Sequence, residues 1–177
     1  MNMGVFLSIL SFLADILHFI KVCPKFYIEI PAKKKNRAND QSGNDGDYYL
    51  LNVINKHPKV PAHNVEVYVD EFYQKNFEDS EYENISLNFP IRLTWQQPVR
   101  YSLPTLHSKG TITYLVHKNN EIVLSGWCPN DFDYFLKSNK EYLLRVYVQS
   151  KEVRSKNWYL TFSITNNVIQ YITVKEI

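Results

Sequence analysis

The chain has 177 residues, the length of one domain or of one domain with a short appendage. Hydrophobic residues make up 45% of it and charged residues 21%, a globular composition that excludes wholesale disorder. The formal net charge of +2 lacks the basic excess of a dedicated nucleic-acid-binding protein, so we do not expect nucleic acid as a partner. Its two cysteines are too few for a disulfide scaffold or a four-thiolate zinc site.

Residues 1–22 are predicted to form a separate, hydrophobic and amphipathic α-helix. The apolar stretch from residue 5 to residue 22 would reach about 27 Å as a helix, slightly less than the roughly 30 Å hydrocarbon core of a bilayer. Its polar side chains are three or four positions apart, as on one helix face: Ser8, Ser11, Asp15 and His18. The apolar side chains that we expect to contact a membrane or an oligomer partner are Phe6, Leu10, Leu13, Leu17 and Phe19.

Four interpretations of this helix are open: a spanning helix, an interfacial or bundle-forming amphipathic helix, a helix packed on the protein itself or a sister chain, and a cleaved signal. The polar stripe favours the amphipathic helix. Asp15 would be costly at lipid depth, which counts against a spanning helix. The signal peptide is the weakest interpretation because Met1–Gly4 contains no basic residue.

A basic flank follows the predicted helix. Anionic lipid attracts such a cluster of basic residues by about 1 kcal/mol per residue. Beside a spanning helix, the cluster would also keep the domain that follows it in the cytoplasm. The sequence therefore predicts a membrane-associated protein whose domain lies on the cytoplasmic side, with the cell surface as the alternative. An ordinary solvated loop is an equally open interpretation of the flank. The residues expected to contact the membrane here are Lys33, Lys34, Lys35 and Arg37.

From residue 23 to residue 177 the hydrophobic pattern indicates β-strands. Apolar side chains alternate with polar ones from Ile85 to Trp95, although Pro90 implies an edge or a bulge within that run. The segment 32–47 is polar and reads as a long loop. Asn pairs at 119–120 and 166–167 predict hairpin turns, because Asn tolerates positive φ. We expect eight or nine strands within residues 26–30, 48–54, 65–69, 85–96, 111–118, 121–124, 142–148, 158–165 and 168–174.

Two segments resemble known β-sandwich families. Leu136, followed six positions later by Tyr142 at the start of an alternating strand, resembles the tyrosine-corner segment of immunoglobulin-like and fibronectin type III domains. Residues 49–69 resemble the adhesion-related immunoglobulin-like domains of prokaryotic proteins, the CARDB type. The resemblance implies an all-β, immunoglobulin-like antiparallel sandwich with a binding or structural role and no catalytic residues. The candidate fold-defining residues are Leu136, Tyr142, Trp95 and Trp158.

The sequence contains no recognisable pattern for catalysis, metal binding or cofactor binding. It has no phosphate-binding loop, dinucleotide fingerprint or nucleophile elbow, and its histidines lack zinc-ligand spacing. We therefore expect no enzyme activity, no cofactor and no small-molecule substrate, and a hydrolase is the weakest alternative. Several tyrosines fall on the polar side of strands or in loops, a placement favoured at protein interfaces but equally explained by a covering helix or loop. They are Tyr68, Tyr73, Tyr82, Tyr101, Tyr147, Tyr159 and Tyr171.

Two non-enzymatic functions follow from these patterns. The favoured one is a binding or scaffold module that the N-terminal helix holds at a membrane surface or in a larger complex, and that binds a protein partner. The alternative is a self-assembling structural subunit of an envelope filament or shell, with the helices bundled at its centre and the sandwich outside.

Overall fold

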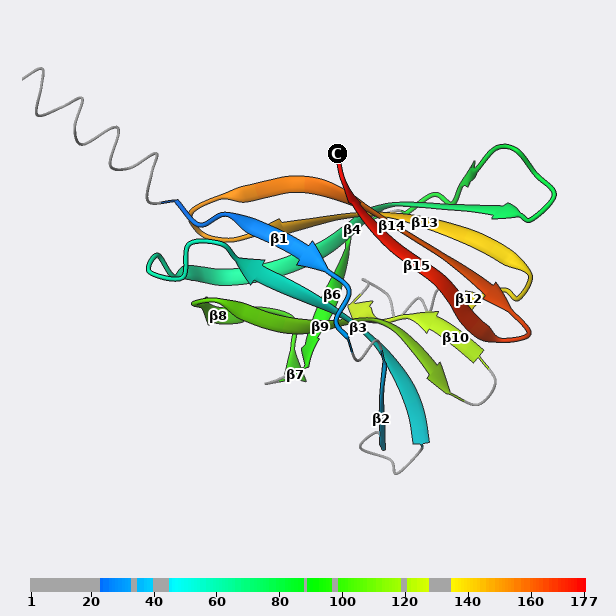
Figure 1. Ribbon diagram of the computed structural model, residues 1–177, viewed down its shortest axis with the longest axis horizontal. Coiled ribbons are helices and arrows are strands. Elements are labelled where there is room, and N and C mark those ends of the chain that lie inside the picture. Colours follow the sequence, from blue (N-terminus) through cyan, green and yellow to red (C-terminus); the bar gives the residue numbers. More distant parts are fainter. Residues whose placement is uncertain are drawn as a thin grey trace, which may run out of the picture.

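The computed structural model describes residues 23–32, 35–39, 45–87, 89–96, 99–118, 121–127 and 135–177. These residues form an all-β, antiparallel and curled sheet, an architecture compatible with a β-sandwich (Figure 1). None of them forms a helix long and apolar enough to cross a membrane. The predicted helix contacts and part of the basic flank lie outside the described residues: Phe6, Leu10, Leu13, Leu17, Phe19, Lys33 and Lys34.

The main path of the sheet runs in the order β1-β3-β9-β6-β4-β13-β14-β15. The bounds of these strands are Phe26–Glu29 for β1, Asp45–Asn55 for β3, Lys109–Lys118 for β9, Ile91–Gln96 for β6, Ala62–Asn76 for β4, Lys140–Gln149 for β13, Arg154–Thr165 for β14 and Val168–Glu176 for β15. Shorter strands flank this path, namely β2 (Lys35–Asn39), β5 (Glu83–Asn84), β7 (Val99–Arg100), β8 (Leu103–Leu106), β10 (Glu121–Leu124), β11 (Gly126–Trp127) and β12 (Phe135–Leu136). The described part of the chain thus holds 15 strands rather than eight or nine.

Strand β6 connects the two layers of the curled sheet. Its first half pairs with β4, where Ile91 lies opposite Val69, and its second half pairs with β9, where Trp95 lies opposite Ile112. Trp95 is fully buried at this crossing, and its Nε1 donates a hydrogen bond to the carbonyl oxygen of Val65 at 3.0 Å. The layer of β1, β3 and β9 is thereby folded onto the layer of β4, β13, β14 and β15.

An aromatic cluster fills the space between the layers. Tyr114 of β9 meets Phe162 of β14 edge to face, with 6.0 Å between ring centroids. Tyr142 stacks on Phe162 at 5.4 Å and lies 5.7 Å from Phe72 of β4. Trp158 is also fully buried. Because these rings come from four strands of both layers, they hold the layers together, as aromatic pairs contribute beyond their buried area.

Tyr142 has the geometry expected of a tyrosine corner. Its ring is 1% exposed, and its hydroxyl donates a hydrogen bond to the carbonyl oxygen of Lys137 at 3.0 Å. The same hydroxyl accepts one from the backbone N–H of Lys137 at 2.6 Å. Burial raises the pKa of Tyr142 to about 12, so the hydroxyl remains a donor at neutral pH. Leu136 is buried on β12 immediately before this connection.

Three segments differ from the sequence-based expectation. The region predicted as a long loop, 32–47, contains β2, which pairs antiparallel with the first half of β3. The expected strand at 85–96 is regular only from Ile91, because Pro90 has no N–H to donate, and Phe89 is half-exposed rather than buried. Strand β4 continues to Asn76, well beyond the run 65–69 in which the sequence predicted a strand.

The last hairpin is confirmed. Thr165 of β14 lies opposite Val168 of β15, and Asn166 and Asn167 between them have φ values of 50° and 60°. Two successive positive φ values match the twist of a two-residue hairpin, and Asn adopts them more readily than other side chains with a Cβ.

We expect Tyr142→Phe to lower the free energy of unfolding by about 1–2 kcal/mol, because two partly buried hydrogen bonds to the backbone of Lys137 are lost. Urea denaturation measures the change. Tyr27→Phe is the matched control, since Tyr27 is half-buried on β1 and its hydroxyl has no hydrogen bond within the described part of the chain. Equal losses in the two variants would contradict this account of the corner.

Candidate interaction surface

A β-bulge in β4 brings two carboxylates to the outer face of its layer. Glu71 pairs with Arg145 of β13, and Val69 pairs with Val146, so Asp70 is an inserted residue. A residue inserted into one strand interrupts the alternation, so that two successive side chains lie on the same side of the sheet. Asp70 and Glu71 therefore both lie on the outer face, where both carboxylates are partly exposed.

Arg145 neutralises this pair of carboxylates. Its Nε and Nη2 donate to the two oxygens of Asp70 at 2.9 and 3.1 Å, a bidentate arrangement. Its Nη1 lies 2.5 Å from Oε1 of Glu71, and Glu71 also accepts a hydrogen bond from the Tyr73 hydroxyl at 2.9 Å. The hydrogen bonds to Asp70 are the main reason that the pKa of Arg145 is raised. Bidentate pairs of this kind are stronger and more rigid than single contacts.

Two stacked tyrosines lie beside the ion pairs. The rings of Tyr68 on β4 and Tyr147 on β13 are 5.2 Å apart and inclined by 16°. The guanidinium of Arg154 also lies over the ring of Tyr147, 3.9 Å from the ring centroid. The same guanidinium lies 3.4 Å from an oxygen of Asp70. Tyr147 is therefore only 7% exposed although it points away from the core.

A second arginine extends the surface toward β6. Arg92 donates to Oε1 of Glu66 at 2.8 Å, and its guanidinium lies 5.4 Å from the ring centroid of Tyr101. Glu66 also accepts a hydrogen bond from the Tyr68 hydroxyl at 2.6 Å. Burial, followed by the bond to Glu66, raises the pKa of Tyr68 to about 12. At neutral pH the hydroxyl of Tyr68 is therefore an uncharged donor beside the charges of Glu66 and Arg92.

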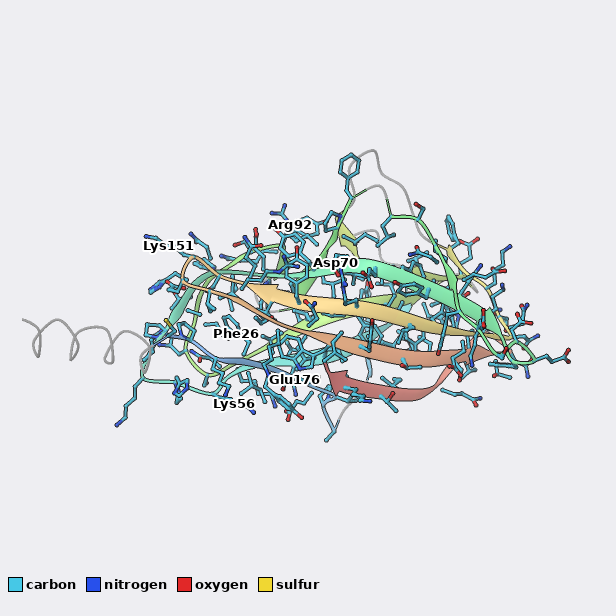
Figure 2. The ribbon with its side chains drawn as sticks, turned by 90° about the horizontal axis from the view of Figure 1, so that it is seen from above. Phe26, Lys56, Asp70, Arg92, Lys151 and Glu176 are labelled. Atoms are coloured by element: carbon cyan, nitrogen blue, oxygen red, sulfur yellow. The ribbon has the colours of Figure 1, made fainter. Side chains whose placement is uncertain are left out.

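We call these residues the tyrosine–arginine surface. Figure 2 shows two of its members, Asp70 and Arg92, on the same side of the sheet. Tyr159 belongs to it because it lies opposite Arg145 on β14. The full set is Glu66, Tyr68, Asp70, Glu71, Tyr73, Arg92, Tyr101, Arg145, Tyr147, Arg154 and Tyr159.

The structure gathers most of the outward tyrosines here but separates the other predicted residues from it. Tyr82 lies farther along the layer, where its hydroxyl donates a hydrogen bond to Glu141. The side chain of Tyr171 is not among those that the structure describes. Lys35 and Arg37 lie on β2, at the edge of the other layer. The fold-defining residues are in the core: Leu136, Tyr142, Trp95 and Trp158.

The sequence contained one signal of the bulge that was missed. Buried positions follow odd numbers through Val65, Val67 and Val69, and the next buried position is Phe72. A regular strand would have buried residue 71, so the change of phase indicates an inserted residue. No local signal identifies the ion pairs, because Asp70 and Arg145 are 75 positions apart.

No protein-family model matches the chain, and no curated protein is significantly similar to it. The functional interpretation therefore rests on the chemistry of the tyrosine–arginine surface.

Among the described residues, no group of three or more His, Cys, Asp and Glu side chains could hold a metal ion. The carboxylates of the surface are engaged by arginines or tyrosines, and the arrangement is one of stacked rings and fixed guanidinium groups. Tyrosine and arginine are the residue types enriched at the energetic centres of protein interfaces.

We expect Arg145→Met to lower the free energy of unfolding by about 1–2 kcal/mol, because Asp70 and Glu71 would be left side by side without their cation. Lys109→Met is the control, since Lys109 is 53% exposed beside Glu29 and an exposed pair contributes only a few tenths of a kcal/mol. Urea denaturation at low and high salt measures both. A loss in Arg145→Met no larger than in Lys109→Met would show that the bulge does not depend on Arg145.

Proposed function

We propose that the protein is a non-enzymatic, immunoglobulin-like binding module that presents the tyrosine–arginine surface to a protein partner. The N-terminal segment holds it at a membrane surface, with the sandwich on the cytoplasmic side. The observation that carries the binding role is the stack of Tyr68 on Tyr147 under the guanidinium of Arg154, bordered by Arg92 and Tyr101.

Rigidity of this surface supports a binding role. The rings of Tyr68 and Tyr147 and the guanidinium of Arg145 are fixed by stacking and by bidentate bonds before any partner arrives. A side chain that is already ordered loses less conformational entropy on association, which leaves more of the contact energy for binding. Arg154, at 56% exposure, and Tyr101, at 37%, remain accessible at its rim.

Local geometry supports the immunoglobulin-like assignment. The strands in both layers pair antiparallel. Tyr142 makes the paired hydrogen bonds to the backbone of Lys137 that a tyrosine corner would make. In the segment that resembles the CARDB type, Asn55 ends β3 and its side-chain amide donates to the carbonyl of Val60 at 2.7 Å, which closes the loop before β4.

The membrane role rests on the sequence of residues 1–22 and on the basic flank that follows. An apolar helix with one polar stripe partitions to the membrane interface, and lysines beside it add attraction to anionic lipid. Deletion of residues 1–22 is expected to release the domain from membranes without unfolding the sheet.

The binding role is tested by affinity purification of the full chain from its native cells, followed by quantification of co-purified proteins. Arg154→Ala combined with Tyr101→Ala should weaken retention of a specific partner by about tenfold or more, because both lie at the accessible rim of the surface. Phe135→Ala combined with Lys137→Ala is the control, since both residues are exposed but lie outside the surface. The proposal fails if the rim variant retains every partner of the unaltered chain, or if only the control loses them.

A further inference from the structure

The exposed charges of the domain are distributed unevenly along its long axis. The connection from β4 to β5 forms an acidic hairpin at the end away from the start of β1 (Figure 1). Its exposed carboxylates are Glu78, Asp79, Glu81 and Glu83. The opposite end, which we call the basic end, carries the exposed residues Lys25, Lys56, Lys59, Lys151 and Lys156.

Backbone contacts hold the loops of the basic end together. The N–H of Lys56 donates to the carbonyl of Lys25 at 2.8 Å, and the N–H of Lys151 donates to the carbonyl of His63 at 2.9 Å. Lys25 and Lys156 line the same pocket, together with Glu176. Lys56 and Lys151 lie on either side of this end of the molecule, near Phe26 at the start of β1 (Figure 2).

The carboxylates nearby do not balance these lysines. Glu152 is engaged by His63 at 2.7 Å, and Glu176 by Lys156 at 2.8 Å. The hydrogen bond from Lys156 lowers the pKa of Glu176, and the charges of Lys156, Lys56 and Lys25 lower it further. Three lysines that act on one exposed carboxylate indicate a positive potential across this end.

The N-terminal segment joins the domain at the basic end. Residues 1–22 join the described domain at Cys23, two positions before Lys25 and three before the start of β1. A segment held in a membrane would therefore hold the basic end next to the lipid. Each lysine near an anionic leaflet increases membrane partitioning about fivefold. At physiological salt the attraction is screened over a distance of roughly 8 Å, so only lysines close to the lipid contribute. The acidic hairpin, by the same electrostatics, is repelled from the leaflet.

We propose that the basic end docks directly on anionic lipid headgroups. The domain then stands on the membrane with its acidic hairpin pointing away, and the tyrosine–arginine surface faces sideways, where a partner can reach it. This inference rests on the proposed tether but adds a second contact, made by the folded domain itself.

The test is co-sedimentation of the full chain with phosphatidylcholine vesicles and with vesicles that also contain phosphatidylserine. The unaltered chain should bind the phosphatidylserine vesicles more tightly, and Lys56→Glu with Lys151→Glu should reduce that binding by about tenfold or more. Lys137→Glu with Lys140→Glu makes the same change in net charge at the other end and should leave the binding within about twofold. Circular dichroism confirms that each variant is folded.

Three outcomes overturn the inference. If the basic-end variant binds phosphatidylserine vesicles as tightly as the unaltered chain, the tether stands and the docking does not. If only Lys33→Glu with Lys34→Glu removes the preference, the flank rather than the folded domain contacts the lipid. If the unaltered chain binds neither kind of vesicle, the tether fails and the docking fails with it.

Discussion

The insertion of Asp70 into β4 is the constraint on which both faces of the layer of β4, β13, β14 and β15 depend. Before the insertion, β4 buries Val65, Val67 and Val69, and after it the strand buries Phe72. Without the change of phase, Phe72 would face solvent and the contact of its ring with Tyr142 would be lost. One inserted residue therefore allows β4 to supply core side chains from Ala62 as far as Phe72.

The same insertion generates the charge pattern outside. Two neighbouring carboxylates on one face of a sheet repel each other unless a cation lies between them, and Arg145 from the paired strand is in that position. Arg154 then bridges from Asp70 to the ring of Tyr147, which connects the ion pairs to the stacked tyrosines. Core packing and surface chemistry are in this way two consequences of one irregularity in the backbone.

The sequence predicted the strands whose apolar side chains alternate, and each of the nine expected runs overlaps a strand. It did not predict β2, because the residues of that strand have no apolar alternation and pair with β3 through their backbone. Residues 85–89 misled the prediction because their alternation precedes Pro90, where the ladder cannot continue.

The candidate surface was predictable only in outline. Strand phase correctly placed Tyr68 on the outer side of β4 and Tyr147 on that of β13. Tyr73 lies on the outer side only because the bulge shifts the alternation of β4. The arginines that complete the surface come from other strands, and their partners depend on the register of β13 against β4 and on the bulge within it. Such non-local pairing has no signature in a single sequence.

The central claim, that the outer face of β4 and β13 is where a partner binds, is tested most directly by hydrogen–deuterium exchange of the full chain, alone and with its co-purified partner. The account predicts slower exchange in peptides that cover residues 66–73 and 145–154, and unchanged exchange in β1 and β3 of the other layer. Protection confined to β1, β3 and β9, with none in β4 and β13, would contradict it.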